Sequence, residues 1–263
     1  MRLTRLLAST AAVAATGLLG ATDAHAAAPT VNYVALGDSY SSGVGTTDSY
    51  LDGCDRSTAA YPYLYAQATS PASFAFAACA GATTADVESS QLSTLSPATT
   101  LVSITIGGND VGFSAVMQDC VFKDDSGCVS AVDGAKERVQ NELPHRLDTL
   151  YTQIRSHAPN AHVVVLGYPQ FYDLARSGSC PGLDTAKRVA INDGAALLDK
   201  QIAAEVVKHT SFTFVNTAPY FSGHEICDAA PWLHSLTLPT SSSYHPTADG
   251  HKNGYLSALE SGV

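Results

Sequence analysis

Five short apolar runs recur along the chain, and longer stretches with the pattern of amphipathic helices separate them. We predict that the runs are strands, at residues 31–36, 73–77, 100–106, 162–166 and 211–215. The fourth run, HVVVL, does not alternate apolar with polar residues, so its strand should be buried on both faces. Strands that alternate with helices pair in parallel through βαβ crossovers. The pattern therefore predicts a three-layer α/β/α sandwich around a five-stranded, mainly parallel sheet.

The segments between and after these runs are predicted to be helices, at residues 59–69, 83–95, 130–157, 184–209 and 247–261. Pro144 lies inside the third of them, where a proline would bend a helix. No internal repeat or low-complexity linker interrupts the pattern, so one domain is expected. In parallel sheets of this kind, ligands bind beyond the carboxyl ends of the strands. Chemistry should therefore follow Leu36, Ala77, Ile106, Leu166 and Val215.

The first 26 residues are predicted to be a secretory signal peptide, which is removed from the mature protein. Arg2 and Arg5 give a positive start, an apolar run follows, and residues 24–26 (AHA) have the small-x-small pattern of a cleavage site. The alternative is a transmembrane anchor, but the uninterrupted apolar stretch is shorter than the ~20 residues that a bilayer core requires. The domain is thus expected to span residues 27–263 of a secreted, extracellular protein.

The charge balance narrows the classes of partner. The chain has 14 basic and 24 acidic residues, which gives a formal net charge of −10 at pH 7. Such a surface repels polyphosphate, so nucleic acid is not an expected partner. It also offers no attraction to anionic lipid, and any action on lipid would have to rest on apolar contact. No later segment is apolar for long enough to span a membrane, and we expect a monomer without integral membrane association.

Six cysteines follow the predicted signal peptide, and an even number in an exported chain is typical of disulfides. Sequence alone leaves every pairing possible, but pairing between neighbours would let each bridge staple one excursion from the core. The favoured pairs are Cys54–Cys79, Cys120–Cys128 and Cys180–Cys227. A metal site is the alternative use of cysteines, but no C-x-x-C spacing and no cluster of Cys and His supports one. We therefore predict no metal.

Three short motifs follow the first three predicted strands. Ser39 lies in GDSY, at a strand-to-helix junction where a helix N-terminus favours negative charge, although serine is also an ordinary helix cap there. Gly81, in CAGATT, can turn its backbone N–H toward the cleft. Asn109, in GGND, follows two glycines that permit close approach of a substrate, and its amide offers a donor. The last two motifs are equally compatible with plain turns.

A fourth motif, YHPTADGH, precedes the last predicted helix and contains His245. Pro246 disfavours a helical conformation at His245 and fits the first turn of the helix that follows. In a chain with nine histidines, a surface role is the ordinary alternative for any one of them. Together, however, the four motifs supply a nucleophile, two oxyanion donors and a base, which are the groups that acyl transfer requires.

In order and approximate spacing, these four motifs resemble those of the GDSL or SGNH hydrolase superfamily. The stretches ALGDSYSSGVG, CAGATT, TIGGND and YHPTADGH are similar to its secreted actinobacterial lipases, esterases and phospholipases, and the resemblance covers nearly the whole chain after the signal. It implies a flavodoxin-like strand order, disulfides between neighbouring cysteines, and no cofactor. It further implies that Ser39 is the nucleophile and His245 its general base, with an oxyanion hole formed by the N–H groups of Ser39 and Gly81 and the side chain of Asn109.

One position departs from the pattern of the superfamily. Many members carry an aspartate three residues before the histidine, and this chain has Ser242 there. The resemblance to the actinobacterial group implies a Ser–His dyad, in which a backbone carbonyl replaces that carboxylate. We predict that the carbonyl of Ser242 accepts a hydrogen bond from Nδ1 of His245. The alternative is Asp249, which would serve the terminus of the closing helix more naturally.

The expected function is hydrolysis of carboxylic esters outside the cell, with acyl esters of lipids as the first substrate class. The acyl esters of glycerophospholipids are the alternative, and acetyl groups on plant polysaccharide come third. Aromatic residues in or near predicted loops are expected at the rim of the cleft, where they form an acyl-chain groove or, as the alternative for some of them, only cover the core: Phe113, Tyr168, Phe171, Tyr172, Phe221 and Trp232. A non-enzymatic alternative is a secreted lipid- or carbohydrate-binding module with a degenerate site, but all four motifs are intact.

Overall fold

The computed structural model describes residues 30–47, 49–179 and 182–263. The predicted signal peptide and Cys180 therefore lie outside the described residues. The sheet has five strands, β1 (Asn32–Gly37), β2 (Ser73–Phe76), β3 (Leu101–Thr105), β4 (His162–Leu166) and β5 (Phe212–Val215). All neighbours pair in parallel, in the order β2-β1-β3-β4-β5. This is the flavodoxin-like order, and the predicted parallel sheet is confirmed.

Burial differs between the inner and the edge strands, as the apolar runs imply. β1, β3 and β4 are almost wholly buried, whereas β2 and β5 at the edges keep partial exposure. Inner strands of a sheet covered on both faces have no solvated side, which is why their sequences do not alternate.

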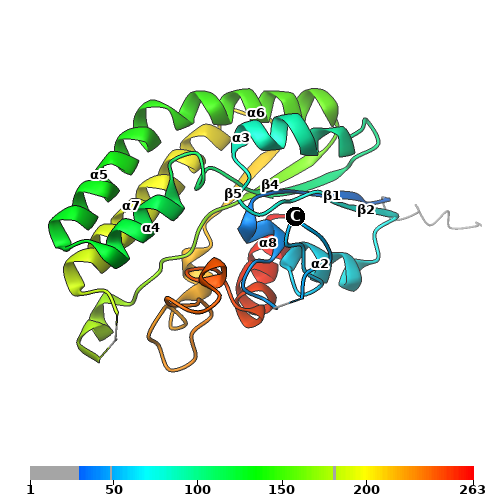
Figure 1. Ribbon diagram of the computed structural model, residues 1–263. Coiled ribbons are helices and arrows are strands. Elements are labelled where there is room, and N and C mark those ends of the chain that lie inside the picture. Colours follow the sequence, from blue (N-terminus) through cyan, green and yellow to red (C-terminus); the bar gives the residue numbers. More distant parts are fainter. Residues whose placement is uncertain (1–29, 48, 180–181) are drawn as a thin grey trace, which may run out of the picture.

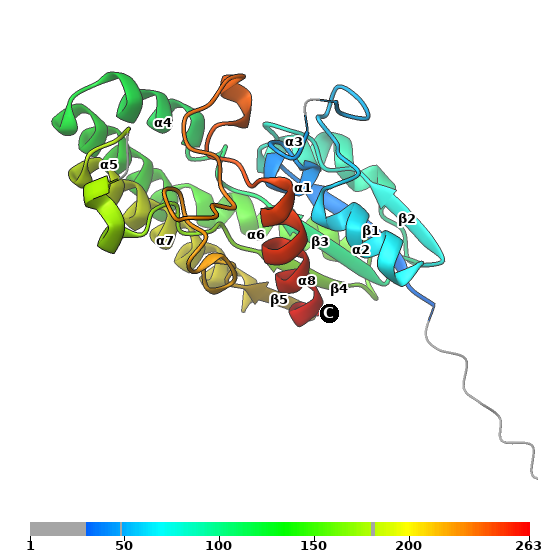
Figure 2. The same ribbon diagram turned by 90° about the horizontal axis from the view of Figure 1, so that it is seen from below.

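Helices cover both faces of the sheet (Figure 1). One face carries α3 (Thr84–Asp86), α6 (Leu143–His157) and α7 (Thr185–Val206), and the other carries α2 (Tyr61–Thr69) and α8 (Leu256–Gly262). The short α1 (Ser39–Ser42) directly follows β1, and α4 (Phe113–Phe122) and α5 (Asp125–Asn141) extend past the carboxyl ends of the strands (Figure 2). None of the helices in the described ranges is long and apolar enough to cross a membrane.

Two of the predicted helices, at residues 83–95 and 247–261, include turns that are not α-helical. After α3, the chain continues through a π-helical turn (Val87–Gln91) and a 3₁₀ turn (Leu92–Thr94), so that helical backbone fills most of the predicted segment 83–95. A second π-helical turn (Gly250–Tyr255) leads directly into α8. The second of these turns contains Gly250 and His251 of the YHPTADGH motif, and π-helical turns are frequent at functional sites.

The prediction of one bent helix at residues 130–157 is wrong. The segment forms α5 and α6, and α5 begins earlier because the side chain of Asp124 caps it by accepting from the Gly127 N–H. Pro144 lies in the first turn of α6, where its missing N–H leaves no bond unmade. The sequence pattern also does not predict α4, which is short and follows Gly112 in the left-handed conformation (φ 80°).

Two of the three predicted disulfides are present. Cys54–Cys79 ties the loop after α1 to the segment that follows β2, and Cys120–Cys128 ties α4 to α5. Cys227 is also disulfide-bonded, and the partner predicted for it, Cys180, is outside the described residues.

Candidate active site

The hydroxyl of Ser39 and the imidazole of His245 meet at the carboxyl end of the sheet. Ser39 begins α1 directly after β1, and His245 lies in the loop before the last helical segment. Ser39 Oγ is 2.8 Å from His245 Nε2, and His245 Nδ1 is 3.0 Å from the carbonyl oxygen of Ser243. A carbonyl can only accept, so Nδ1 carries the proton and the lone pair of Nε2 faces the serine. The imidazole is therefore in the tautomer that accepts a proton from Ser39.

The prediction for Ser242 is wrong, because the orienting carbonyl belongs to Ser243. The carbonyl of Ser242 accepts from the backbone N–H of His245 instead, at 3.2 Å, within the tight turn that follows a short 3₁₀ segment. Tyr244, between them, has a positive φ of 63°, a conformation that residues other than glycine seldom adopt. Asp249, the alternative partner, is exposed one turn further along the chain.

Burial sets the protonation state of His245. It lowers the pKa of His245 to about 4, even though the hydrogen bond to the carbonyl of Ser243 acts in the opposite direction. The ring of Tyr40 packs against the imidazole with centroids 5.1 Å apart, and the hydroxyl of Tyr40 donates to the carbonyl of Tyr244 at 2.5 Å. His245 is thus neutral at ordinary pH and held from two sides.

Asp38 fixes the turn that carries Ser39. It is fully buried and caps α1 by accepting from the Tyr40 N–H, and it also accepts from the hydroxyls of Thr105 (2.7 Å) and Tyr168 (2.5 Å). Burial raises the pKa of Asp38 to about 6, against the opposing effect of these hydrogen bonds. Tyr168 also accepts from the Gly108 N–H at 3.1 Å, so this network joins the ends of β1, β3 and β4.

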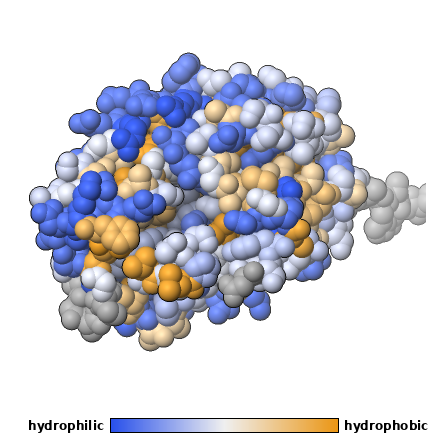
Figure 3. Space-filling model, viewed as in Figure 1, coloured by the Kyte–Doolittle hydropathy of each residue, from blue (hydrophilic) through white to orange (hydrophobic). Residues whose placement is uncertain are grey.

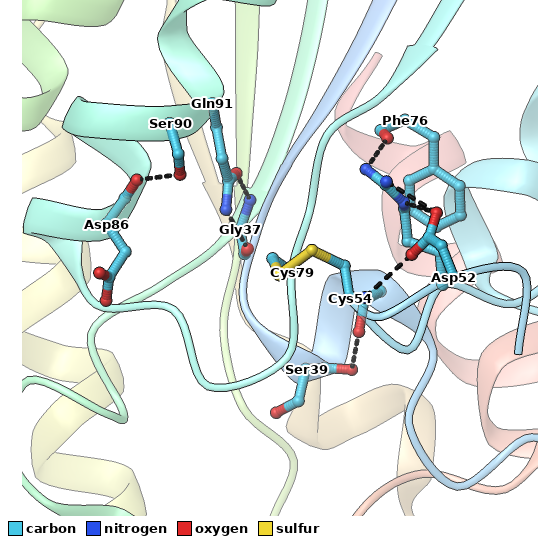
Figure 4. Close-up of a disulfide and its surroundings, with 11 residues drawn as sticks. Gly37, Ser39, Asp52, Cys54, Phe76, Cys79, Asp86, Ser90 and Gln91 are labelled. Atoms are coloured by element: carbon cyan, nitrogen blue, oxygen red, sulfur yellow. Dashed lines mark hydrogen bonds and ion pairs between the residues drawn. A yellow bond between two sulfur atoms is a disulfide. The ribbon is translucent and has the colours of Figure 1, made fainter.

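Gln91 makes a second connection to the same turn, which the sequence reasoning missed. Its side-chain amide accepts from the N–H of Gly37 (2.8 Å) and donates to the carbonyl of Gly37 (2.9 Å), as Figure 4 shows beside the Cys54–Cys79 bridge. Gly37 has a φ of 121°, and a Cβ there would lie 2.4 Å from the Thr105 carbonyl oxygen. Glycine at this position was a visible signal, but nothing local indicated Gln91 as its partner.

Glycine also permits the segments that carry Ser39 and His245 to approach each other. A Cβ on Gly45, which has a φ of 92°, would lie 2.7 Å from the Pro246 carbonyl oxygen and 3.1 Å from Cβ of His245. The carbonyl of Gly45 is also 2.8 Å from Nε2 of His234. The SSGVG segment after Ser39 thus packs backbone to backbone against the histidine loop.

The predicted oxyanion donors Gly81 and Asn109 lie in two loops that are joined by hydrogen bonds. Asp110 accepts from the N–H and the hydroxyl of Thr84, at 3.0 and 2.6 Å, and the side chain of Asn109 donates to the carbonyl of Ala82 at 3.0 Å. An amide nitrogen has two hydrogens, so Asn109 keeps a second donor. Asn109 lines the same groove as Ser39, whereas Gly81 lies in an exposed turn next to that groove's loops and is not among the lining residues.

An apolar groove begins at Ser39 and runs between α4, α5 and α7. It opens to solvent, and a hollow is visible on this face of the molecule in Figure 3. The apolar side chains that line it come mainly from the three helices: Val111, Phe113, Val116, Met117, Val132, Val139, Phe171, Ile191 and Leu198. Such a groove suits an acyl chain placed with its carbonyl at Ser39.

The aromatic residues predicted for the groove divide into two groups. Phe113, Tyr168 and Phe171 line it. Tyr172, Phe221 and Trp232 are elsewhere: the backbone N–H of Tyr172 donates to Asn192, Phe221 is buried against Tyr255, and Trp232 stacks on His224. The first group lies in the segments that follow β3 and β4, at the carboxyl edge of the sheet.

Potential metal ligands gather away from this site. In the part of the chain that the structure describes, Asp148, Glu205 and His209 have ligand atoms within 4.8 Å of one another. They lie on α6 and around the end of α7, next to the start of β5 and thus at the amino ends of the strands. Lys208 already pairs with Glu205 at 2.7 Å.

Comparison with known proteins gives consistent results. The model of the family described as GDSL-like Lipase/Acylhydrolase matches residues 35–252. The chain is 49% identical over 264 residues to Lipase 1 of Streptomyces coelicolor, with 98% of this chain and 97% of that protein covered. It is 47% identical over 269 residues to a lipase of Streptomyces rimosus, with 99% of both covered.

Solved structures of Streptomyces lipolytic enzymes are also similar to this chain. The extracellular lipase of Streptomyces rimosus superimposes with a TM-score of 0.85 at 47% identity, and phospholipase A1 of Streptomyces albidoflavus NA297 with 0.86 at 48% identity. Each comparison covers 89% of this chain and 100% of the other.

Proposed function

Because the chain belongs to the GDSL-like lipase/acylhydrolase family and hydrolyses carboxylic esters, we propose that it cleaves the acyl esters of lipids with Ser39 as nucleophile and His245 as general base. The observation that carries this proposal is the 2.8 Å contact between Ser39 Oγ and the Nε2 of a neutral imidazole. The carbonyl of Ser243 takes the part of the carboxylate in a catalytic triad, since it fixes the tautomer and stabilises the imidazolium that forms.

The reaction follows from this geometry in two halves. As Ser39 Oγ attacks the ester carbonyl carbon, its proton passes to His245 Nε2, and the resulting oxyanion accepts from the N–H groups of Ser39 and Gly81 and the side chain of Asn109. His245 then gives the proton to the departing alcohol oxygen, which leaves the acyl group on Ser39. In the second half, water attacks the acyl carbon and gives a proton to His245, which returns it to Ser39 as the acid departs.

The apolar groove supports a lipid acyl chain as the acid part of the ester. Each methylene that leaves water for such a groove contributes about 0.8 kcal/mol to binding, so a long chain is favoured over acetyl. The likeness to phospholipase A1 of Streptomyces albidoflavus favours acyl esters of glycerophospholipids as a second candidate substrate.

The dyad is tested by Ser39→Ala and His245→Ala, with Ser242→Ala as the control. The first two variants should lose on the order of 10⁴-fold or more in kcat on a nitrophenyl ester. The control should stay near the parent, because the backbone around Ser242 is unchanged. A fluorophosphonate should add its mass to the peptide that contains Ser39. Modification of another serine, or an active Ser39→Ala variant, would contradict the proposal.

We also propose that the protein acts outside the cell. The pattern of residues 1–26 supports export, and so do the disulfides, since such bonds persist in oxidising compartments. Secretion by a host that processes such signals, followed by N-terminal sequencing of the protein in the medium, should give a first residue at Ala27. Retention of Met1 in an intracellular product would contradict this.

A further inference from the structure

Large apolar side chains are exposed in the segments that follow the carboxyl ends of the strands, on the side of the sheet where the groove lies. Five of them define a surface that we call the apolar rim: Leu51, Phe122, Leu174, Leu236 and Leu238. The most exposed are Leu238 (88%) and Phe122 (83%). Leaving such side chains in water is unfavourable, and a group of them around a ligand site marks a surface that contacts another apolar phase.

Four of the five rim residues belong to segments that also carry groove or dyad residues, and Leu51 lies in the loop after α1 that Cys54–Cys79 ties to the segment after β2. Phe122 ends α4, whose earlier turns line the groove, and Leu174 follows the lining residue Phe171 by three positions. Leu236 and Leu238 flank Thr237 in the loop that leads to His245, and Figure 3 shows apolar surface bordering the hollow.

That loop is anchored to the dyad by a pair of hydrogen bonds. The hydroxyl of Ser243 accepts from the N–H of Thr237 at 3.0 Å and donates to its carbonyl at 3.3 Å. The same Ser243 orients His245 through its carbonyl. The exposed leucines on either side of Thr237 are therefore held at a fixed place relative to the catalytic histidine.

The charges beside the rim indicate which kind of lipid surface it fits. Three cations near rim residues are each paired with a carboxylate: Arg56 with Asp52 (2.7 Å), Lys123 with Asp119 (2.9 Å) and Arg176 with Asp228 (3.1 Å). With these cations neutralised and a net charge of −10 on the chain, anionic headgroups are repelled. A zwitterionic headgroup carries no net charge and meets no such barrier.

We propose that the apolar rim inserts into the surface of a zwitterionic phosphatidylcholine bilayer and presents the open groove to it. This inference rests on the proposed function, because docking on a bilayer brings the groove next to the acyl chains that the enzyme is proposed to cleave from their esters. The docking itself requires no catalysis. It is therefore measured in the Ser39→Ala background, where vesicles stay intact.

The test compares Phe122→Ser and Leu238→Ser with Val207→Ser. Val207 is 81% exposed, and it lies between α7 and β5 at the amino ends of the strands, away from the groove. In co-sedimentation with phosphatidylcholine vesicles, each rim variant should partition about tenfold less, which corresponds to the loss of one apolar side chain from the lipid. Val207→Ser should bind like its parent, and replacing half of the lipid with phosphatidylglycerol should weaken binding by all.

A second measurement uses the active enzyme. In each rim variant, hydrolysis of vesicle phosphatidylcholine divided by hydrolysis of a soluble nitrophenyl ester should fall about tenfold, whereas Val207→Ser should keep the parental ratio. The proposed docking through the apolar rim would be overturned by any of three results: equal vesicle affinity of all three variants, no vesicle binding, or stronger binding to anionic vesicles. Activity that survives in Ser39→Ala would overturn the dyad instead, so the two failures are distinguishable.

Discussion

At the scale of single residues, the proposed reaction depends on a proton that moves between Ser39 Oγ and His245 Nε2, which are 2.8 Å apart, and on what keeps Nε2 unprotonated. Only a neutral His245 accepts the proton of Ser39. Desolvation favours the neutral imidazole. The single carbonyl that accepts from Nδ1 stabilises the protonated imidazole less than a carboxylate would. A dyad oriented by a carbonyl therefore keeps its base available under more acidic conditions than an exposed histidine allows.

The acid limb of the pH profile follows from this. Burial lowers the pKa of His245 from 6.5 to about 4, so the base is protonated, and activity lost, only as the pH approaches 4. For a soluble ester, kcat/KM should stay constant as the pH falls through 6.5 and become half-maximal near 4. A half-maximum near 6 would instead identify Asp38, whose pKa burial raises to about 6.

Tyr40 is expected to act as a positioning residue for the base. Its hydroxyl donates a hydrogen bond to the carbonyl of Tyr244. Tyr244 has a positive φ, and this backbone conformation directs the side chain of the next residue, His245, toward Ser39. Tyr40→Phe removes that bond and should lower kcat about fivefold at unchanged KM, since a hydrogen bond of this kind contributes about 1 kcal/mol.

The matched control for that variant is Tyr33→Phe. Tyr33 is also buried, and its hydroxyl bonds to Ser103 in the sheet, at 2.6 Å. Both variants should lose similar thermal stability, but Tyr33→Phe should keep its kcat. Equal kcat values for the two variants would mean that Tyr40 has only a structural role.

At this scale, residues that the structure brings together were predictable where one motif holds them, and were not predictable where the partner is distant in sequence. Ser39, Asn109 and His245 each lie in a short motif, and the sheet brings the motifs together. Gln91 is 54 residues away from Gly37, and no local pattern links them. For Ser242 and Ser243, the choice depended on one left-handed residue, and a tyrosine gives no signal of a positive φ.

At the scale of elements, the groove depends on helices that pack against each other beyond the sheet. α5 and α7 form its long walls, and α4, tied to α5 by Cys120–Cys128, closes one side. The sequence pattern did not predict α4, because ten residues after a glycine-rich turn give only a short periodic signal. The split between α5 and α6 was missed because Pro144 fits the start of a helix as well as a bend inside one.

Gly194 on α7 is expected to set how much acyl chain the groove accepts. It lines the groove, and a Cβ there would lie 3.3 Å from Val132 Cγ1 on α5. Gly194→Val should therefore fill the space between the two helices and lower kcat/KM for long-chain esters by about tenfold or more, with little effect on short-chain esters.

The matched control for Gly194→Val places the same residue elsewhere in the groove helices. At Gly134 on α5, a Cβ would meet only the end of the Arg138 side chain, at 3.8 Å. Gly134→Val should leave the profile of activity against chain length unchanged, measured on a series of nitrophenyl esters. An equal loss on all chain lengths in Gly194→Val would indicate distortion of the site and not a shorter groove.

At the scale of the whole molecule, the strand order decides where the motifs meet. β1 lies between β2 and β3, so the chain leaves β1 and β3 in opposite directions along the sheet, and a crevice opens where the order reverses. Ser39 and Asn109 follow these two strands. This much was predictable, because the alternation of strands and helices is a property of the entire sequence. The closing of the crevice by the histidine loop was implied only by resemblance, since no periodic pattern describes that loop.

The same scale governs stability, where the two described disulfides should differ. Cys54–Cys79 spans 25 residues and Cys120–Cys128 spans 8. If restriction of the unfolded chain dominates, the bridges stabilise the protein by about 3.5 and about 2.5 kcal/mol, respectively. Replacing both cysteines of a pair with serine should thus lower Tm more for the longer loop, as measured by calorimetry.

Contacts in the folded protein also favour a larger contribution from Cys54–Cys79 to stability. Cys79 donates to the carbonyl of Gly37 and Ala80 donates to that of Cys54, both at 3.0 Å, so the longer loop is packed against the turn that carries Ser39 (Figure 4). Loss of Cys54–Cys79 should therefore also lower kcat on a soluble ester, whereas loss of Cys120–Cys128 should act mainly on long-chain substrates through α4. A larger fall in Tm for the shorter loop would mean that packing of α4 on α5, and not chain entropy, sets the contribution of these bridges.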